Sequence, residues 1–288
     1  MSDAERATIG VVGAGTMGAG IAQVAATAGH AVLLFDVDPH GLARATAAVG
    51  GFLERAVAKG TLEGTERDAI QARLSTTTDL AALAAAGVVI EAVPERLDLK
   101  RDLFAQLEAI VAPEAVLATN TSTLSVAAIA AGLARPERAC GMHFFNPAPL
   151  MALVEVVRGP ATGEGTLARV VALARAWSKE PVVVGDTPGF IVNRVARPFY
   201  GEALRLVGDG HADVATVDRL ARDAGFAMGP FELMDLIGID VNLAAATSVW
   251  EGFFHEPRFR PHPLQRAMVE SGRLGRKTGR GYYEHPSG

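Results

Sequence analysis

A histidine and a glutamate lie in two neighbouring apolar segments of the sequence GMHFFNPAPLMALVEVVR, residues 141–158. A carboxylate such as Glu155, placed among leucine and valine, is costly to bury unless it has a partner, and the imidazole of His143 is a suitable one. A histidine polarised by a buried carboxylate is a general base suited to neutral pH. Spacing alone leaves the alternative open that Glu155 faces outward from an edge strand and His143 is an ordinary core histidine.

A glycine-rich turn, GAGTMG at residues 13–18, lies between a β-branched run and a helix-compatible segment. In such a turn the first glycine permits tight folding, the second lets the backbone approach a pyrophosphate, and the third allows close helix packing. Asp36 ends the next apolar run, where it can accept hydrogen bonds from a ribose and repel a 2′-phosphate, which favours NAD over NADP. We assign nucleotide contacts to Gly13, Gly15, Thr16, Met17, Gly18 and Asp36.

The order of the elements predicts two domains. Apolar strands alternate with helical segments up to about residue 186, which predicts a Rossmann-like doubly wound α/β domain over residues 1–186. Within it, residues 61–74 read as a polar helical arm. After residue 186 the strand pattern stops, and residues 187–288 are predicted to form an all-α domain for substrate binding and dimerisation. Its apolar residues exceed what so small a domain can hide, which favours a homodimer.

Two further groups of residues are candidates for ligand contacts. Ser122 lies among small polar residues that follow the strand at 116–118, where ligands bind in such sheets; alternatively it caps the helical segment at 126–131. Lys59 or Arg55 can contact substrate phosphates, or simply belong to a solvated helix face.

The composition excludes several classes of protein. The chain has 288 residues and a net charge of −5, so no basic surface for nucleic acid is expected. The uncharged run at 7–35 is rich in glycine and is interpreted as a buried βαβ unit, not a membrane span. The single cysteine, Cys140, fits a reducing compartment and matches no metal motif. The first ten residues have no signal-peptide layout, so we expect a cytoplasmic protein. Because no metal motif is present in the sequence, we also expect no bound metal.

Together these segments resemble the 3-hydroxyacyl-CoA dehydrogenases, and the short 3-hydroxybutyryl-CoA type is nearest in length. The resemblance rests on GAGTMGAG, NTSTLS, HFFNP, LVEVV, DTPGFIVNR, MGPFELMDLIGID and GRKTGRGYY, in this order along nearly the whole chain. It implies the NAD-dependent oxidation of an L-3-hydroxyacyl-CoA to a 3-ketoacyl-CoA, as in fatty-acid β-oxidation. It also implies an acyl-CoA partner and a site between the two domains.

The resemblance implies a role for individual residues. His143 is the general base and Glu155 orients it, while Ser122 and Asn193 hydrogen-bond substrate oxygens. Glu95 lies near the nicotinamide ribose. By the same motifs, Asn120 is assigned to the cofactor and Asn146 to the substrate.

Arg197 departs from the general family pattern, which has an apolar residue there. It lies four residues after Asn193, on the same helical face. The segments NRVARPFYGEALRL and GPFELMDLIGID resemble the enzymes of phenylacetate breakdown that oxidise 3-hydroxyadipyl-CoA. A guanidinium at this position can hold the distal carboxylate of a dicarboxylyl chain. Alternatively, Arg197 pairs with Glu202 or lies at a dimer surface.

Two competing interpretations remain. β-Hydroxyacid dehydrogenases of the hydroxyisobutyrate type share this layout but use a lysine in the helical domain. Here the corresponding stretch carries Asn193 and Arg194, and Lys277 is the one lysine in the last third. The second interpretation is a non-catalytic, crystallin-like NAD-binding protein, against which the intact candidate site argues.

Overall fold

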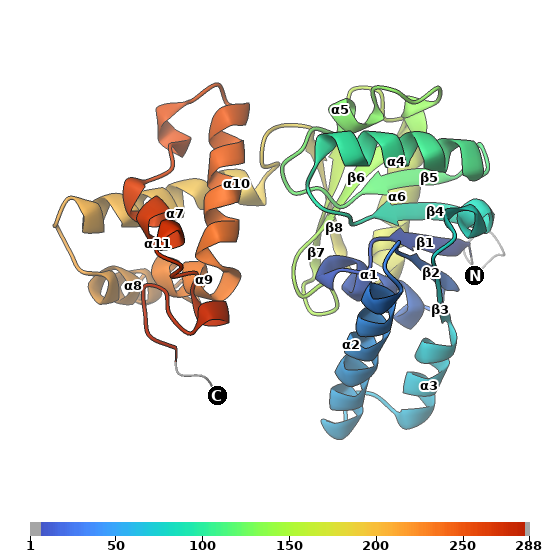
Figure 1. Cartoon of the computed structure of the whole chain (residues 1–288), viewed down its shortest axis with the longest axis horizontal. Coiled ribbons are helices and arrows are strands. Elements are labelled where there is room, and N and C mark those ends of the chain that lie inside the picture. Colours follow the sequence, from blue (N-terminus) through green and yellow to red (C-terminus); the bar gives the residue numbers. More distant parts are fainter. Residues whose placement is uncertain (1–6, 286–288) are drawn as a thin grey trace. The chain divides into compact units, whose positions relative to one another are not determined.

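The computed structural model describes residues 7–285 (Figure 1). Residues 1–6 and 286–288 lie outside this part, and they include much of the N-terminal stretch on which the expectation about a signal peptide rests. The chain divides into two compact units, one ending at Asp186 and the other beginning at Thr187. Each unit is described by itself.

The first unit is built on an eight-stranded sheet with the order β3-β2-β1-β4-β5-β6-β7-β8. Its strands are β1 Thr8–Val12, β2 Val32–Phe35, β3 Leu74–Thr77, β4 Ala86–Glu91, β5 Val116–Thr119, β6 Ala139–Phe144, β7 Leu153–Arg158 and β8 Glu180–Gly185. All neighbouring pairs are parallel except β6 and β7. The carboxyl ends of β1 to β6 therefore lie along one edge of the sheet, where ligands bind in such folds.

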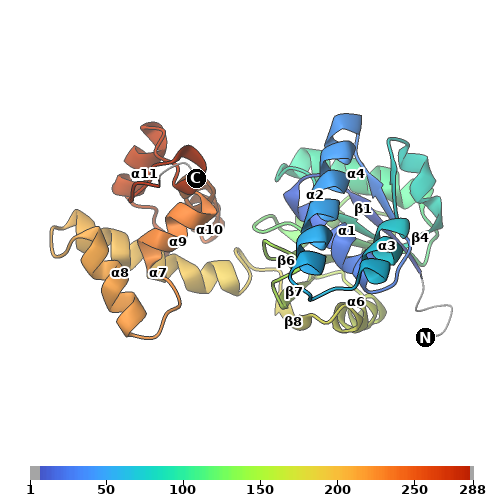
Figure 2. The same ribbon diagram turned by 90° about the horizontal axis from the view of Figure 1, so that it is seen from below.

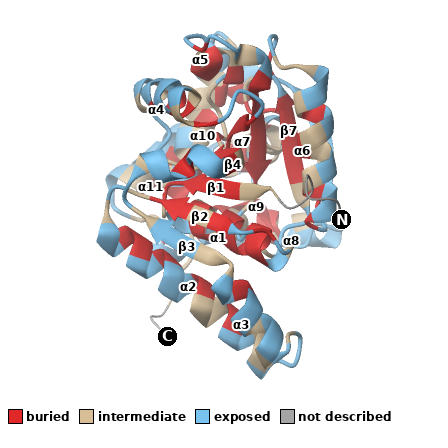
Figure 3. Ribbon diagram, turned by 90° about the vertical axis from the view of Figure 1, so that its right-hand side faces the viewer, coloured by how far each residue is buried: buried red, intermediate tan, exposed pale blue. Residues whose placement is uncertain are grey.

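Helices cover both faces of this sheet. They are α1 Thr16–Thr27, α2 Pro39–Ala58, α3 Gly64–Ala72, η2 Leu80–Ala85, α4 Leu97–Ile110, α5 Val126–Ala130, η3 Pro136–Arg138 and α6 Glu164–Ala176. One apolar core joins the sheet to α1, α2 and α6, and a second joins the opposite face to η2, α4 and α5 (Figure 2). Alternate residues of β4 enter the two cores, Val88 and Ile90 one and Val89 the other. Strands such as β4 and β7 are accordingly buried between helices with exposed outer faces (Figure 3).

The prediction of one helical arm over residues 61–74 is wrong at its C-terminal end. Helix α3 ends at Ala72, and the chain continues as β3, which pairs in parallel with β2 through Val32 and Leu74. Because β3 is an edge strand with Ser75 and Thr76 exposed, it needs no apolar run. Backbone pairing with β2 decides its conformation.

The expected alternation of strands and helices also fails between β6 and β7. A loop of residues 145–152 without a helix joins them, and its Asn146–Pro147 peptide bond is cis. The two strands are antiparallel, with His143 directly opposite Glu155. The loop thus folds the two apolar segments together.

The second unit is helical. It contains α7 Val192–Gly208, α8 Val214–Asp223, α9 Pro230–Ile237, α10 Ile239–Gly252, η4 Pro257–Phe259, α11 Pro263–Glu270 and η5 Arg276–Thr278. Its core includes Leu204, Phe231 and Met234. Asp213 caps α8 by accepting a hydrogen bond from the backbone of Thr216 at 2.7 Å.

Two buried carboxylates hold the glycine-rich C-terminal segment, residues 272–285 (the tail), against the helices of this unit. Asp218 accepts a hydrogen bond from the Tyr283 hydroxyl at 2.7 Å, and Asp235 accepts bonds from the backbone N–H groups of Tyr282 and Tyr283 at 2.9 and 3.0 Å. A side chain at Gly281 would collide with the Asp235 carboxylate. This explains physically why the tail has glycine there.

In residues 7–285 no single helix has both the length and the apolar character needed to cross a membrane; α9 and α10 meet that test only as a pair, which is bent by 102°.

Candidate active site

The predicted histidine–glutamate pair forms in the structure. Nδ1 of His143 lies 2.7 Å from Oε2 of Glu155, and the two residues are 4% and 1% exposed. They occupy directly opposite positions on β6 and β7, so their side chains share one face of the sheet. The alternative of an outward-facing Glu155 and an unrelated core histidine is therefore wrong.

This contact decides how the imidazole can act. When Nδ1–H donates to Glu155, the basic lone pair of the neutral ring lies on Nε2. The Phe145 ring packs against the imidazole, with centroids 4.6 Å apart. Asn120 fixes the strand beside it, since its Oδ1 accepts a hydrogen bond from the Phe144 backbone at 2.8 Å. The histidine is thus oriented by a carboxylate, an aromatic ring and a tethered strand.

The glycine turn at the end of β1 has a shape that suits a pyrophosphate. Gly13 has φ of +103°, and a Cβ there would lie 2.7 Å from the Ala92 carbonyl oxygen. A Cβ at Gly18 would collide with the Gly13 carbonyl oxygen. Gly15 precedes α1 with open space where a Cβ would be, and no side chain caps this helix. The N–H groups at the start of α1, where Thr16 is exposed, therefore fit the phosphates of NAD.

Asp36 is tied to this turn. Its Oδ2 accepts a hydrogen bond from the Ala14 backbone at 2.6 Å, and its Oδ1 accepts one from the Asp38 backbone at 2.9 Å. Each carboxylate oxygen has a second lone pair, which leaves Asp36 able to accept hydrogen bonds from ribose hydroxyls. Met17 is half-buried in the first turn of α1.

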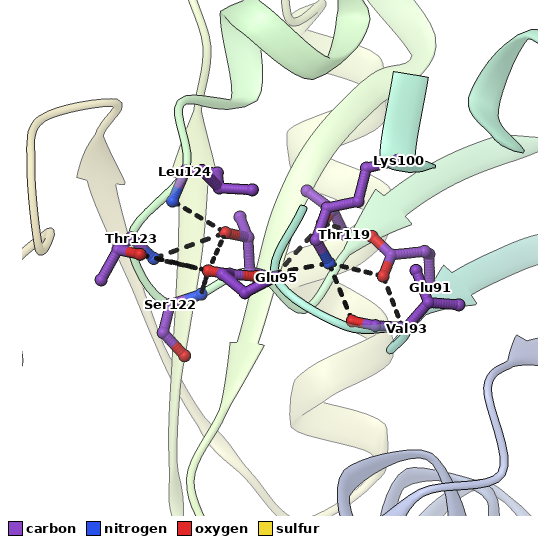
Figure 4. A network of polar contacts seen from close by, with 9 residues as sticks. Glu91, Val93, Glu95, Lys100, Thr119, Ser122, Thr123 and Leu124 are labelled. Carbon is purple, nitrogen blue, oxygen red and sulfur yellow. Dashed lines mark hydrogen bonds and ion pairs between the residues drawn. The ribbon is translucent and has the colours of Figure 1, made fainter. Parts of the chain in front are cut away.

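Ser122 lies in the loop between β5 and α5. The structure excludes the alternative that it caps the following helix, because Ser125 is the capping residue and accepts a hydrogen bond from the Ala128 backbone at 3.2 Å. The backbone N–H of Ser122 instead donates to Oε1 of Glu95 at 2.9 Å (Figure 4). The side chain of Ser122 is half-buried at the carboxyl end of the sheet.

Arg197 lies one turn after Asn193 on α7 and is only 7% exposed. Its guanidinium donates to the Asn242 carbonyl oxygen at 2.9 Å and to Oδ1 of Asn193 at 3.3 Å. Glu202 forms its ion pair with Arg205, so the alternative pairing with Arg197 is wrong. Within the described residues no carboxylate forms an ion pair with Arg197, and burial lowers the pKa of this guanidinium to about 10.

The remaining predicted contacts lie at exposed positions. Asn146 is exposed in the loop after β6, and Lys59 is exposed at the C-terminal end of α2. Among residues 7–285 no group of three or more histidine, cysteine, aspartate or glutamate side chains is arranged to hold a metal ion.

Sequence reasoning missed the buried ion pair of Glu91 and Lys100. They form an ion pair with Nζ 2.6 Å from Oε1, and their side chains are 0% and 1% exposed. The signal was present, since Glu91 ends the apolar run VVIEAV much as Glu155 lies within LVEVV.

Comparison with known proteins identifies the family. The model of the NAD-binding domain of 3-hydroxyacyl-CoA dehydrogenase matches residues 8–187, and the model of the C-terminal domain of the same family matches residues 189–285. The chain belongs to the 3-hydroxyacyl-CoA dehydrogenase family. The predicted fold class, a Rossmann-like domain followed by a helical one, and the predicted cofactor, NAD, are thereby confirmed.

Individual relatives of this chain also carry the names of 3-hydroxyacyl-CoA dehydrogenases. The chain is 50% identical over 278 residues to the 3-hydroxyadipyl-CoA dehydrogenase of Escherichia coli, which covers 96% of this chain and 58% of that protein. It is 41% identical to a probable 3-hydroxybutyryl-CoA dehydrogenase of Deinococcus radiodurans, over 96% of this chain and 99% of the relative. The crystal structure of (S)-3-hydroxybutyryl-CoA dehydrogenase from Ralstonia eutropha superimposes with a TM-score of 0.93 at 40% identity, over 97% and 99% of the two chains.

These findings decide between the competing interpretations. An NAD-dependent 3-hydroxyacyl-CoA dehydrogenase, the predicted enzyme class, is the class of the family to which the chain belongs. The hydroxyisobutyrate type and the non-catalytic crystallin-like protein are not favoured.

The chain spans little more than half of the length of the Escherichia coli relative.

Proposed function

We propose that this protein oxidises an L-3-hydroxyacyl-CoA to the 3-ketoacyl-CoA with NAD, using His143 as general base and Glu155 as the carboxylate that orients it. The observation that carries the proposal is the buried contact of 2.7 Å between Nδ1 and Oε2 of this pair. The direct test is the formation of NADH, followed by its absorbance, from NAD and L-3-hydroxybutyryl-CoA. Purified protein that forms no NADH from any 3-hydroxyacyl-CoA contradicts the proposal.

The residues divide the work of the reaction. NAD, when bound, accepts the hydride that leaves C3 of the substrate. The proton of the 3-hydroxyl passes to Nε2 of His143, so that the C3–O bond becomes a carbonyl. Glu155, which is 1% exposed, then stabilises the imidazolium that has formed.

Two donors are assigned to the oxygen on C3. Ser122 and Asn193 hydrogen-bond this oxygen while its charge changes, and such donors are most effective where water is excluded. The orientation of Asn193 supports its role: its amide oxygen accepts a bond from Arg197 at 3.3 Å, which leaves the amide NH₂ to donate. Asn146 contacts the substrate, and Lys59 contacts the CoA phosphates.

The first unit, residues 1–186, is assigned to NAD and the second, residues 187–288, to substrate binding and dimerisation. The nucleotide contacts remain those proposed above: Gly13, Gly15, Thr16, Met17, Gly18, Asp36, Glu95 and Asn120. Of these, Asp36 is expected to decide the preference for NAD over NADP, because a carboxylate beside the ribose repels the 2′-phosphate of NADP.

Replacing Asp36 by asparagine is therefore expected to lower the preference for NAD. The amide oxygen can still accept a backbone hydrogen bond, but the negative charge is lost. Because close like charges oppose binding by several kcal/mol, the ratio of kcat/KM for NAD to that for NADP should fall by about tenfold or more. Steady-state kinetics with both nucleotides measure the ratio, and an unchanged ratio contradicts the role of Asp36.

The acyl chain of the preferred substrate ends in a carboxylate, as in 3-hydroxyadipyl-CoA, and Arg197 binds this carboxylate. The supporting observation is a buried guanidinium whose described hydrogen bonds go only to oxygens of Asn193 and Asn242. At least one of its five N–H donors remains for a ligand. One helical turn, about 5.4 Å, separates Arg197 from Asn193, which suits a chain with three carbons beyond C3.

The 3-hydroxyadipyl-CoA dehydrogenase of Escherichia coli, 50% identical, supports the same substrate class. An enzyme that oxidises such a dicarboxylyl-CoA would act in the breakdown of phenylacetate. An enzyme that oxidises a monocarboxylic chain, as in 3-hydroxybutyryl-CoA, would act in the β-oxidation of fatty acids.

The protein is a homodimer through its helical unit. This unit exposes large apolar side chains, among them Val195, Leu220, Phe226 and Val241, which are 52–69% exposed. Light scattering should give a mass of about 60 kDa, twice the 30.0 kDa of one chain. The variant Phe226→Glu should shift the mass toward that of one chain, because a charge in an apolar interface opposes association.

The matched control is Val183→Glu, at a 48% exposed position of β8 in the other unit, which should remain dimeric. A wild-type mass of one chain contradicts the dimer. A dimer that withstands Phe226→Glu contradicts this choice of interface.

The protein acts in the cytoplasm. Support comes from Cys140, the one cysteine of the sequence, which is buried and can form no intrachain disulfide, as suits a reducing compartment.

A further inference from the structure

Two side-chain amides lie behind the Arg197 guanidinium in the helical unit. Oδ1 of Asn242, on α10, accepts a hydrogen bond from Nε2 of Gln265, on α11, at 2.8 Å. The same oxygen lies 3.5 Å from a guanidinium nitrogen of Arg197, which also donates to the Asn242 carbonyl oxygen at 2.9 Å. Asn242 and Gln265 are 2% and 1% exposed. Two buried amides from two helices are thus joined in series to the arginine of a third.

The amide nitrogen of Asn242 is left over from this series. Because Arg197 and Gln265 both donate to the Asn242 side chain, the atom that they contact is its oxygen, and its NH₂ group points elsewhere. This nitrogen is buried and makes no hydrogen bond of good geometry with the residues that the structure describes. A buried donor without an acceptor is costly and rare, so the position calls for an acceptor.

The surroundings of this amide favour an anion as the acceptor. Arg197 and Asn242 line one pocket of the helical unit together with Arg258 and Arg260, and none of the described residues that line it is acidic. The Tyr200 ring packs on the Arg197 guanidinium, with Cζ 5.0 Å from the ring centroid, and shields it from water on that side. A carboxylate satisfies both the free amide donor and the positive charge of the lining.

We propose that Asn242 and Gln265 determine specificity for a dicarboxylyl chain. The Asn242 amide donates a second hydrogen bond to the distal carboxylate that Arg197 binds, and Gln265 is a positioning residue that fixes this amide. The inference deepens the proposed function and rests on the carboxylate role of Arg197. Two donors on different helices match the two oxygens of a carboxylate, whereas a methyl group in the same place leaves the NH₂ group unpaired.

Asn242→Asp is the sharpest variant, because it keeps the size of the side chain. One carboxylate oxygen can still accept from Gln265, while the other replaces the donor by a negative charge that pairs with Arg197 and repels the distal carboxylate. The ratio of kcat/KM for 3-hydroxyadipyl-CoA to that for 3-hydroxybutyryl-CoA should fall about 10- to 100-fold. Asn242→Leu removes the donor without adding a charge, and the ratio should fall about tenfold.

Gln265→Leu tests positioning. The substrate ratio should fall by a smaller factor, about threefold, because the Asn242 amide keeps its donor but loses its anchor. In the Asn242→Leu background it should not change the ratio further, because the positioned group is absent. The matched control is Gln23→Leu, at a 5% exposed glutamine on α1 of the other unit, which should leave the ratio unchanged. Equal losses for both substrates in Gln265→Leu would show a merely structural role.

A matched pair of ligands separates carboxylate binding from turnover. Adipyl-CoA and hexanoyl-CoA have the same chain length, differ in a terminal carboxylate or methyl group, and lack the hydroxyl that is oxidised. As competitive inhibitors of wild type, adipyl-CoA should bind about tenfold or more tightly than hexanoyl-CoA. Asn242→Asp should abolish or invert this preference. A preference that persists in Asn242→Asp contradicts the assigned role of the amide.

The outcomes distinguish the inference from the function on which it rests. If Arg197→Leu lowers the substrate ratio while both Asn242 variants leave it unchanged, the inference is overturned and the carboxylate role of Arg197 stands. If Arg197→Leu leaves the ratio unchanged, the carboxylate role fails and the inference fails with it. The same holds if the wild-type protein oxidises 3-hydroxybutyryl-CoA but not 3-hydroxyadipyl-CoA.

Discussion

Replacing His143 by alanine should lower kcat by about 100- to 10,000-fold, the range that a general base contributes, while NAD still binds. The expected loss follows from the position of the imidazole. Its Nδ1 is held 2.7 Å from Glu155, so Nε2 is the nitrogen that takes the proton. Without the ring, water must accept the proton as hydride leaves C3. The measurements are NADH formation and the dissociation constant of NAD.

Two variants sharpen this prediction. Glu155→Gln should lower kcat nearly as much, because an amide can donate to Nδ1 and favour the tautomer whose proton is on Nε2. His30→Ala is the matched control: His30 is 2% exposed, and its Nδ1 lies 3.0 Å from the Ala7 carbonyl oxygen. It should lower the melting temperature but leave kcat unchanged. Turnover that survives the loss of His143 would remove this residue from the mechanism.

Replacing Arg197 by leucine should discriminate between two substrates. For 3-hydroxyadipyl-CoA, kcat/KM should fall roughly 10- to 100-fold, because a hydrogen bond to a charged group contributes about 1.5–3 kcal/mol. For 3-hydroxybutyryl-CoA, which has no distal carboxylate, the loss should be much smaller, because of the groups that contact this substrate only Asn193 is affected, through the loss of the hydrogen bond to its Oδ1. The leucine side chain fills much of the space, so the buried position is not left empty.

The matched control is Arg205→Leu, two turns further along α7, where the guanidinium is exposed and pairs with Glu202 at 3.1 Å. It should leave both substrates unaffected. Equal losses for the two substrates in Arg197→Leu would contradict the carboxylate role. Its hydrogen bond to Asn193 would then be the function that remains for Arg197.

The local parts of the nucleotide-binding fold were predictable from the sequence. The turn around Gly13 and Gly18 is constrained locally: a Cβ at Gly18 would collide with the Gly13 carbonyl oxygen, and Gly13 itself has a left-handed φ of +103°. Such short-range requirements leave a fixed residue spacing, which can be read directly. Asp36 belongs to the same pattern, since it hydrogen-bonds the backbone of Ala14 within that turn.

Other features depended on contacts between distant residues. The strand β3 has no apolar run, and pairing with β2 alone makes it a strand. Sequence spacing likewise left open whether Glu155 meets His143. A shift of one residue in the register of β6 and β7 would place the two side chains on opposite faces of the sheet.

The sequence by itself determined the residue types that do chemistry, the glycine turn with its acid, and the change from strands to helices near residue 186, because each depends on residues close together in the chain. Only the tertiary structure decided that His143 faces Glu155, that Arg197 is buried beside Asn193 without a described carboxylate partner, and that Glu95 contacts both Lys100 and the Ser122 loop. These arrangements depend on strand register and on side-chain burial, which arise when segments far apart in the chain pack together.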